Sequence, residues 1–169
     1  MEETAENEAK TIYAKNKLLC EEMLKASSVN FTILRISVAY GNLLDTNHSS
    51  GTVGFFIRKV AKGNNITLYG DGSLKQTFSY VADLVNAILI TIQLDEVINE
   101  CYNIGGGDNI SLLATAYIIV KKYKVGIESV DWPEEALKIE SGDTILSDKK
   151  IQKVIDYNYQ YSLHEWIKK

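Results

Sequence analysis

The residues of this sequence best suited to proton-transfer chemistry are a tyrosine and a lysine, Tyr13 and Lys17. Positions four apart share a face of a helix, so a phenol and an ammonium with this spacing can interact. A phenol titrates near pKa ~10, and lowering that pKa by ~3 units requires roughly 4 kcal/mol of differential stabilisation by neighbouring cations. The pair is therefore a candidate acid/base, although the same spacing also occurs on ordinary solvated helix faces.

Other reactive residue types have simpler explanations. His48 lies in a polar stretch and His164 near the end of the chain, and neither has partners at metal-ligand spacing, so we expect no metal site. Ser37 and Asp83 have no nearby histidine that could complete a hydrolase triad. Asp83 is expected to begin a helix, where a carboxylate favours the positive end of the helix dipole.

Composition indicates one globular domain. The chain has 169 residues, of which 46% are hydrophobic and 24% charged. Its net charge of -4 argues against a nucleic-acid partner, because phosphate binding requires clustered Lys and Arg. The longest apolar stretches fall short of the ~20 residues of a membrane helix and the start is acidic, so we expect no membrane partner and a cytoplasmic protein. Cys20 and Cys101 have neither metal nor disulfide spacing and are expected to be buried thiols.

Hydrophobic periodicity predicts alternating helices and strands. Helices are expected over 11–26, 52–62, 82–94, 111–123 and 149–155. A last helix is expected to begin at a capping box formed by Ser162 and Glu165. Strands are expected over 31–38, 66–69, 76–81, 101–104, 126–130 and 144–146. The nearly continuous apolar run over 31–38 predicts a strand buried on both faces. Gly63 is expected to close a helix in the left-handed conformation and Ser111 to cap one.

A triple glycine, Gly105-Gly106-Gly107, lies between a predicted strand and a predicted helix, where a phosphate-binding loop could also lie. It lacks the spaced G-x-G-x-x-G pattern. We therefore predict a structural loop in which the glycines relieve backbone crowding.

Several segments occur in a characteristic order. They are Tyr13 to Lys17, Phe31 to Gly41, Leu68 to Ser73, Phe78 to Ile88 and Tyr102 to Leu113. In this order the chain resembles the second half of the extended short-chain dehydrogenase/reductase family, the NAD-dependent nucleotide-sugar epimerases and dehydratases. The resemblance implies an α/β fold, with the later strands of a Rossmann-type parallel sheet and a small α/β substrate-binding lobe. It implies one truncated unit over 1–169, in which 1–50 and 82–107 are the remnant of the dinucleotide-binding domain and 51–81 and 108–169 mainly the substrate-binding lobe.

The resemblance also implies roles for the Tyr-Lys pair. Tyr13 would be the acid/base at a sugar hydroxyl during transient hydride transfer to NAD. Lys17 would bind the nicotinamide ribose and lower the pKa of Tyr13. The family's dinucleotide-binding loop has no counterpart in these residues, so we expect the chain alone to bind no NAD and to be inactive. Whether the parent enzyme is an isomerase acting at C4, a 4,6-dehydratase (a lyase) or a reductase stays open.

The substrate-binding positions depart from the family pattern. Where family members have an asparagine in R-x-x-N-V-Y-G-P, this chain has Val38; where they have arginines in G-D-G-x-x-x-R-D-F and R-x-G-D, it has Gln76 and Glu140. An arginine fork holds two phosphate oxygens of a nucleotide-diphosphate sugar, which glutamine does weakly and glutamate opposes. Lys75 or Arg58 could compensate. Either the substrate differs from ordinary sugar nucleotides or catalysis has been lost.

Self-association is a further expectation. In the resembled family the helix with the Tyr-Lys pair commonly packs in a dimeric helix bundle, and Leu18, Leu19 and Met23 could serve this purpose here. A buried strand at 31–38 with no flanking strand upstream would also leave an open, association-prone edge. The leading alternative to an enzyme fragment is a non-catalytic binding or assembly module that retains the fold.

Overall fold

The computed structural model describes residues 1–5, 9–41 and 51–168, so that His48 lies outside the described residues. The helices are α1 (Ile12–Lys25), α2 (Gly51–Ala61), α3 (Val81–Thr91), α4 (Leu112–Tyr123), α5 (Glu134–Ile139), α6 (Lys149–Ile155) and α7 (Leu163–Lys168), with a short 3-10 helix at Asp95–Val97. The strands are β1 (Thr32–Ile36), β2 (Val38–Tyr40), β3 (Ile66–Tyr69), β4 (Lys75–Tyr80), β5 (Glu100–Ile104), β6 (Asp108–Ser111) and β7 (Ile127–Val130).

The strands form three small sheets in which parallel pairing predominates. β1 pairs with β5 and β3 with β7, both parallel, and β4 lies between β2, which is parallel to it, and β6, which is antiparallel. The two strands of each parallel pair are separated along the chain by at least one helix, as parallel pairing requires. The predicted α/β class with a parallel sheet is confirmed.

The predicted single strand over 31–38 was wrong, because these residues belong to two strands. β1 pairs with β5, whereas β2 pairs with β4 in another sheet. Ser37 lies at the change of partner: its backbone N–H still donates to Ile104 O (2.9 Å), while its hydroxyl donates to Ser79 Oγ on β4 (2.8 Å). The strand is also not buried on both faces, because Ile36 is 50% exposed.

Other local predictions needed correction. The expected strand over 144–146 is a single bridge between Thr144 and Gln76, since only one residue there meets the edge of β4. β6 and α5 were not predicted. Cys20 is exposed and Cys101 half-buried, so the expectation of buried thiols was wrong; Cys20 is exposed because α1 has no buried residue at all.

The expected helix ends are confirmed by hydrogen bonds. The Ser111 hydroxyl accepts from Ala114 N (3.1 Å) at the start of α4. Gly63 has φ 75° after α2. Ser162 N donates to the Glu165 carboxylate (3.1 Å), and Glu165 N donates to Ser162 Oγ (3.3 Å), which is the reciprocal pattern of a capping box.

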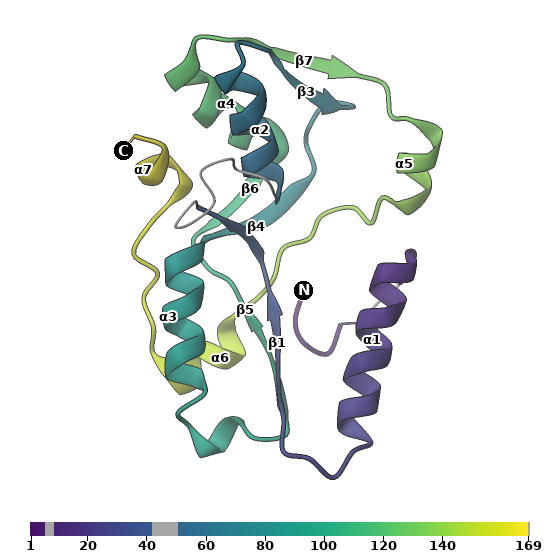
Figure 1. Cartoon of the computed structure of the whole chain (residues 1–169), viewed down its shortest axis with the longest axis vertical. Coiled ribbons are helices and arrows are strands. Elements are labelled where there is room, and N and C mark those ends of the chain that lie inside the picture. The colour runs from purple at the N-terminus through teal and green to yellow at the C-terminus, as the bar shows by residue number, and fades with distance from the viewer. Residues whose placement is uncertain (6–8, 42–50, 169) are drawn as a thin grey trace.

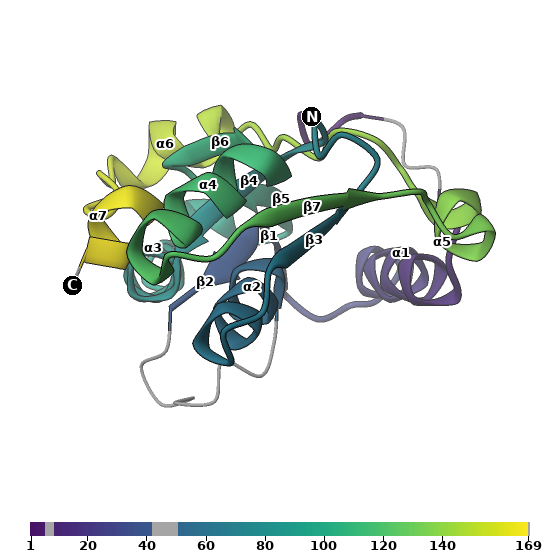
Figure 2. The same cartoon turned by 90° about the horizontal axis from the view of Figure 1, so that it is seen from above.

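Two apolar clusters hold these elements together. The larger joins α2, α4 and α7 to strands β2, β3 and β4, with Phe78 and Ile119 fully buried. The smaller joins α3, β5 and α6 around Ile104 and Ile151. α1 belongs to neither: it lies on the opposite side of the β1–β5 pair from α3 and α6 (Figures 1 and 2). The helix that carries Tyr13 and Lys17 is therefore positioned by something other than a buried apolar face.

Candidate functional site

The structure brings Tyr13 and Lys17 together on the exposed side of α1. The helix begins after Thr11, whose hydroxyl accepts from Ala14 N (3.0 Å), so the pair lies in its first two turns. Lys17 Nζ is 5.4 Å from the centroid of the Tyr13 ring, and the Tyr13 side chain is 72% exposed. A phenol and an ammonium that are accessible and adjacent fit a proton-transfer pair that contacts a bound molecule.

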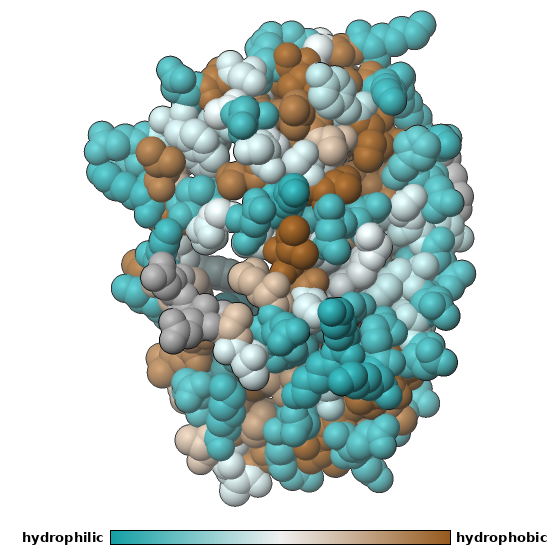
Figure 3. All heavy atoms as spheres, turned by 180° about the vertical axis from the view of Figure 1, so that it is seen from behind, coloured by the Kyte–Doolittle hydropathy of each residue, from teal (hydrophilic) through white to brown (hydrophobic). Residues whose placement is uncertain are grey.

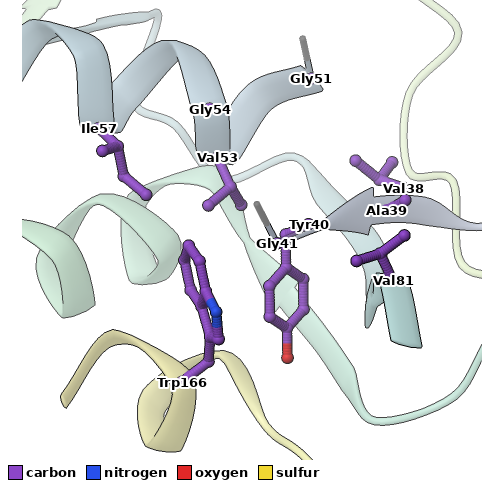
Figure 4. Close-up of a pocket in the computed structure, with 10 residues that line it drawn as sticks. All are labelled: Val38, Ala39, Tyr40, Gly41, Gly51, Val53, Gly54, Ile57, Val81 and Trp166. Carbon is purple, nitrogen blue, oxygen red and sulfur yellow. The ribbon is translucent and has the colours of Figure 1, made fainter. Parts of the chain in front are cut away.

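Val38, one of the three positions that the resemblance predicts to contact substrate, lines a pocket of about 350 Å³ between β2, α2 and α7 (Figure 4). The rings of Tyr40 and Trp166, whose centroids are 5.4 Å apart, form part of its wall. Burial, together with the charge of Asp108, raises the pKa of the Tyr40 phenol, so this tyrosine stays neutral. Tyr13 and Lys17 are not among the residues that line this pocket.

The structure places Gln76 on β4 and Glu140 directly after α5. Gln76 forms the β-bridge with Thr144, four residues after Glu140, and its side-chain oxygen is buried without a hydrogen-bond partner. The Glu140 carboxylate accepts from Ser141 N and Gly142 N, both at 2.8 Å, and so closes a turn.

Two polar contacts at α1 were missed by the sequence analysis. Lys10 Nζ donates to Glu140 O (2.8 Å), which ties the start of α1 to the segment after α5; the two helices lie near each other in both cartoon views (Figures 1 and 2). Arg35 on β1 donates to both carboxylate oxygens of Glu21 on α1, at 2.9 and 2.7 Å. The sequence signal for this contact was Arg35 itself, an arginine within a mainly apolar strand. A half-buried guanidinium requires an acidic partner.

The triple glycine packs against side chains of neighbouring segments. A Cβ at Gly105 would lie 2.4 Å from the Cβ of Ser37, and one at Gly106 would lie 2.3 Å from the Tyr159 ring. The Ser79 hydroxyl donates to Gly106 O (2.7 Å). These close contacts at Gly105 and Gly106 leave no room for a side chain, which supports a structural loop.

Neither a metal centre nor a membrane helix is found in the described part of the chain. Over residues 1–5, 9–41 and 51–168, no three His, Cys, Asp or Glu side chains gather as a metal site. Within the same ranges, each helix is too short or too polar to cross a membrane. His164, on α7, is exposed.

Known proteins with similar sequences act on nucleotide sugars. The chain is 31% identical over 118 residues to the dTDP-L-rhamnose 4-epimerase of Burkholderia thailandensis, a match covering 67% of this chain and 32% of that protein. It is 35% identical over 86 residues to a UDP-N-acetyl-alpha-D-glucosaminuronate decarboxylase of Bacillus cytotoxicus, covering 50% of this chain and 26% of that one. The chain thus spans about a third of the length of the curated relatives it matches.

Solved structures share the fold at lower identity. Pal from Bacillus thuringiensis superposes with a TM-score of 0.87 at 21% identity, over 100% of this chain and 54% of that one. A UDP-glucuronic acid 4-epimerase from Bacillus cereus, solved in complex with UDP-glucuronic acid and NAD, superposes with a TM-score of 0.79 at 20% identity, over 99% of this chain and 54% of that one. Residues 1–105, more than half of the chain, match one family in sequence. The chain belongs to the NAD dependent epimerase/dehydratase family.

Proposed function

We propose that this chain supplies the catalytic helix and the substrate-binding lobe of an NAD-dependent nucleotide-sugar epimerase or dehydratase. The observation that carries the proposal is the accessible Tyr13–Lys17 pair, with Lys17 Nζ 5.4 Å from the Tyr13 ring centroid. The activities of the similar proteins, an epimerase and a decarboxylase of nucleotide sugars, support this class of substrate. Which of these reactions the chain serves stays open.

In this proposal Tyr13 moves a proton at the sugar. Its phenolate oxygen accepts the proton of the hydroxyl at the carbon being oxidised and returns it when the carbon is reduced. Lys17 stabilises the phenolate and donates to a ribose hydroxyl of the dinucleotide. NAD, when bound, supplies the hydride acceptor. Tyr13 and Lys17 are both exposed, so they fit its nicotinamide end.

In this proposal different segments of the chain bind the dinucleotide and the substrate. We assign 1–50 and 82–107 to the dinucleotide-binding part and 51–81 and 108–169 mainly to the substrate lobe. The pocket beside Val38 would hold part of the substrate, with Gln76 and Glu140 at its phosphate side. Gly105 and Gly106 pack closely against the side chains of Ser37 and Tyr159, so we assign the loop a packing role and propose that the 169 residues alone bind no NAD.

A non-catalytic binding or assembly module is the second candidate. It is favoured by the residue types at Gln76 and Glu140, because a carboxylate that closes a turn offers a phosphate no positive charge. In this case the Tyr-Lys pair would be a relic.

The test of the proposed function is turnover by the full natural reading frame that contains these residues. With NAD and a UDP or dTDP hexose, Tyr13→Phe is expected to lower kcat by roughly 10²–10⁴-fold, because the sugar hydroxyl loses its base. Product is measured by chromatography of the sugar nucleotides. Lys15→Met, an exposed lysine of the same helix, is the matched control and should keep parental kcat. Unchanged kcat in Tyr13→Phe, or no turnover of any such sugar by the parent, would favour the assembly module.

Restoring the two arginines is expected to strengthen substrate binding. Gln76→Arg with Glu140→Arg should tighten binding of UDP-glucose at least about tenfold, since a guanidinium pairs two phosphate oxygens. Calorimetry measures the affinity. Gln93→Arg with Glu96→Arg makes the same change of charge at exposed positions and should leave affinity unchanged. Equal effects in the two double variants would contradict the assignment of Gln76 and Glu140.

We also propose that the chain self-associates through α1. Ile12, Leu19 and Met23 are 80%, 59% and 64% exposed, and their spacing places them on one face of the helix. Leu18, which the sequence analysis also named for this surface, is less exposed than these three residues. The view from behind also shows apolar residues exposed at both ends of the molecule (Figure 3).

Leu19→Glu is therefore expected to dissociate the parent oligomer. An unpaired carboxylate buried at the contact costs at least about 3 kcal/mol, which weakens association by roughly 100-fold. Sedimentation velocity in physiological salt measures the change. Leu89→Glu, at a leucine of α3 that is 48% exposed, is the matched control and should sediment as the parent does. A monomeric parent would defeat the proposal.

A further inference from the structure

The orientation of α1 cannot come from apolar burial. Among its residues Ile12–Lys25 none is buried, although the helix carries the candidate catalytic pair. Its most covered residues are Ala14, Leu18 and Glu21, and each is only partly buried. A helix without a buried face needs specific polar contacts to hold one direction.

Arg35 makes such contacts with two segments at once. Its Nε and Nη2 donate to the two carboxylate oxygens of Glu21, at 2.9 and 2.7 Å, and its Nη1 donates to Glu3 O at 3.0 Å. The side chains of Arg35 and Glu21 are only 22% and 13% exposed. A two-pronged contact between planar groups fixes direction as well as distance, which a single lysine contact cannot do.

The contact continues into the sheet through the first residues of the chain. The Glu3 carboxylate accepts from Asn103 N on β5 (2.8 Å), and the Asn103 amide donates to Met1 O and Ser147 O, both at 3.2 Å. β5 is the partner of β1, the strand that carries Arg35. The guanidinium thus joins α1, the β1–β5 pair and residues 1–5 into one polar network.

We propose that Arg35 is the positioning residue for the Tyr13–Lys17 pair, acting through Glu21. Glu21 follows Lys17 by one helical turn and Tyr13 by two, so the direction imposed at Glu21 is transmitted along a rigid helix to both side chains. The hydrogen bond from Arg35 also holds the pKa of the Glu21 carboxyl below its ordinary value, which keeps the pair ionised near neutral pH. The importance of this positioning for catalysis rests on the proposed function. The structural role of Arg35 in directing α1 does not depend on it.

The experiment measures the direction of α1 without using activity. In a Cys101→Ser background, nitroxides are placed on Cys20, which is exposed on α1, and on Lys121→Cys, an exposed position of α4. Pulsed electron paramagnetic resonance gives the distribution of distances between the two nitroxides. Arg35→Gln and Glu21→Gln are each expected to widen this distance distribution about twofold. In hydrogen-exchange measurements, each is expected to speed amide exchange in α1 about tenfold and to leave amide exchange in α4 unchanged.

The variants distinguish positioning from general stabilisation. Glu22→Gln removes the neighbouring exposed pair with Lys25 (2.8 Å) and should change neither readout. The reversed pair, Arg35→Glu with Glu21→Arg, should narrow the distribution relative to either single reversal. An unchanged distribution in both Arg35→Gln and Glu21→Gln, or equal acceleration of exchange in α1 and α4, would overturn the proposal. If α1 loosens as expected while Tyr13→Phe keeps full turnover, the proposed function fails and the positioning role stands.

Discussion

Asp83→Ala is expected to lower the free energy of unfolding by about 3–5 kcal/mol, because it removes a buried carboxylate that accepts three hydrogen bonds. Asp83 is only 2% exposed. Its carboxylate accepts from the Tyr157 hydroxyl at 2.8 Å and from the backbone N–H groups of Gln160 and Tyr161 at 3.0 and 3.1 Å. These bonds hold the segment between α6 and α7 beside α3 (Figure 1). Urea denaturation followed by circular dichroism measures the change.

The matched control for Asp83 is another aspartate at an exposed position. Asp131→Ala should change the free energy of unfolding by less than about 0.5 kcal/mol. Tyr157→Phe removes one of the three donors and should cost about 1 kcal/mol. A loss below about 1 kcal/mol in Asp83→Ala would mean that the carboxylate is no anchor for the C-terminal segment.

Gly105→Ala is expected to cost about 2–3 kcal/mol of the free energy of unfolding through overpacking. The added methyl would lie 2.4 Å from the Cβ and 2.5 Å from the Oγ of Ser37, in a buried site. Ser37 cannot withdraw freely, because its hydroxyl donates to Ser79, which in turn donates to Gly106 O. The methyl therefore strains the point where β1, β4 and β5 are linked.

A second glycine tests this explanation. At Gly126 a Cβ would meet only the flexible Asn65 side chain, 3.2 Å away, so Gly126→Ala should cost less than about 1 kcal/mol. Inorganic phosphate added to the parent should not raise its unfolding temperature, since we assign the glycine loop a packing role. Equal losses in Gly105→Ala and Gly126→Ala, or stabilisation by phosphate that Gly105→Ala removes, would instead favour an anion-binding loop.

The amino-acid sequence by itself determined the features that depend on neighbours along the chain. Three such features are the capping box at Ser162 and Glu165, the N-cap at Ser111 and the left-handed conformation of Gly63. Each involves groups only a few residues apart, so its pattern can be recognised in a short stretch of sequence. The alternation of helices and strands likewise indicated the α/β class. The order of the segments indicated the epimerase/dehydratase family, to which residues 1–105 belong.

The tertiary structure alone decided what depends on partners far along the chain. Ser37 divides an apolar run between two sheets because it meets Ser79, and Asp83 serves the C-terminal segment rather than only its own helix. The apolar pattern of its strand predicted burial around Arg35, yet its partner Glu21 is on a helix with no fully buried residue. The periodicity of apolar residues along a helix or strand indicates how much of that element is covered. It does not indicate which residues elsewhere in the chain cover it. The contacts that direct α1 and close the glycine loop are therefore set only when the chain is folded.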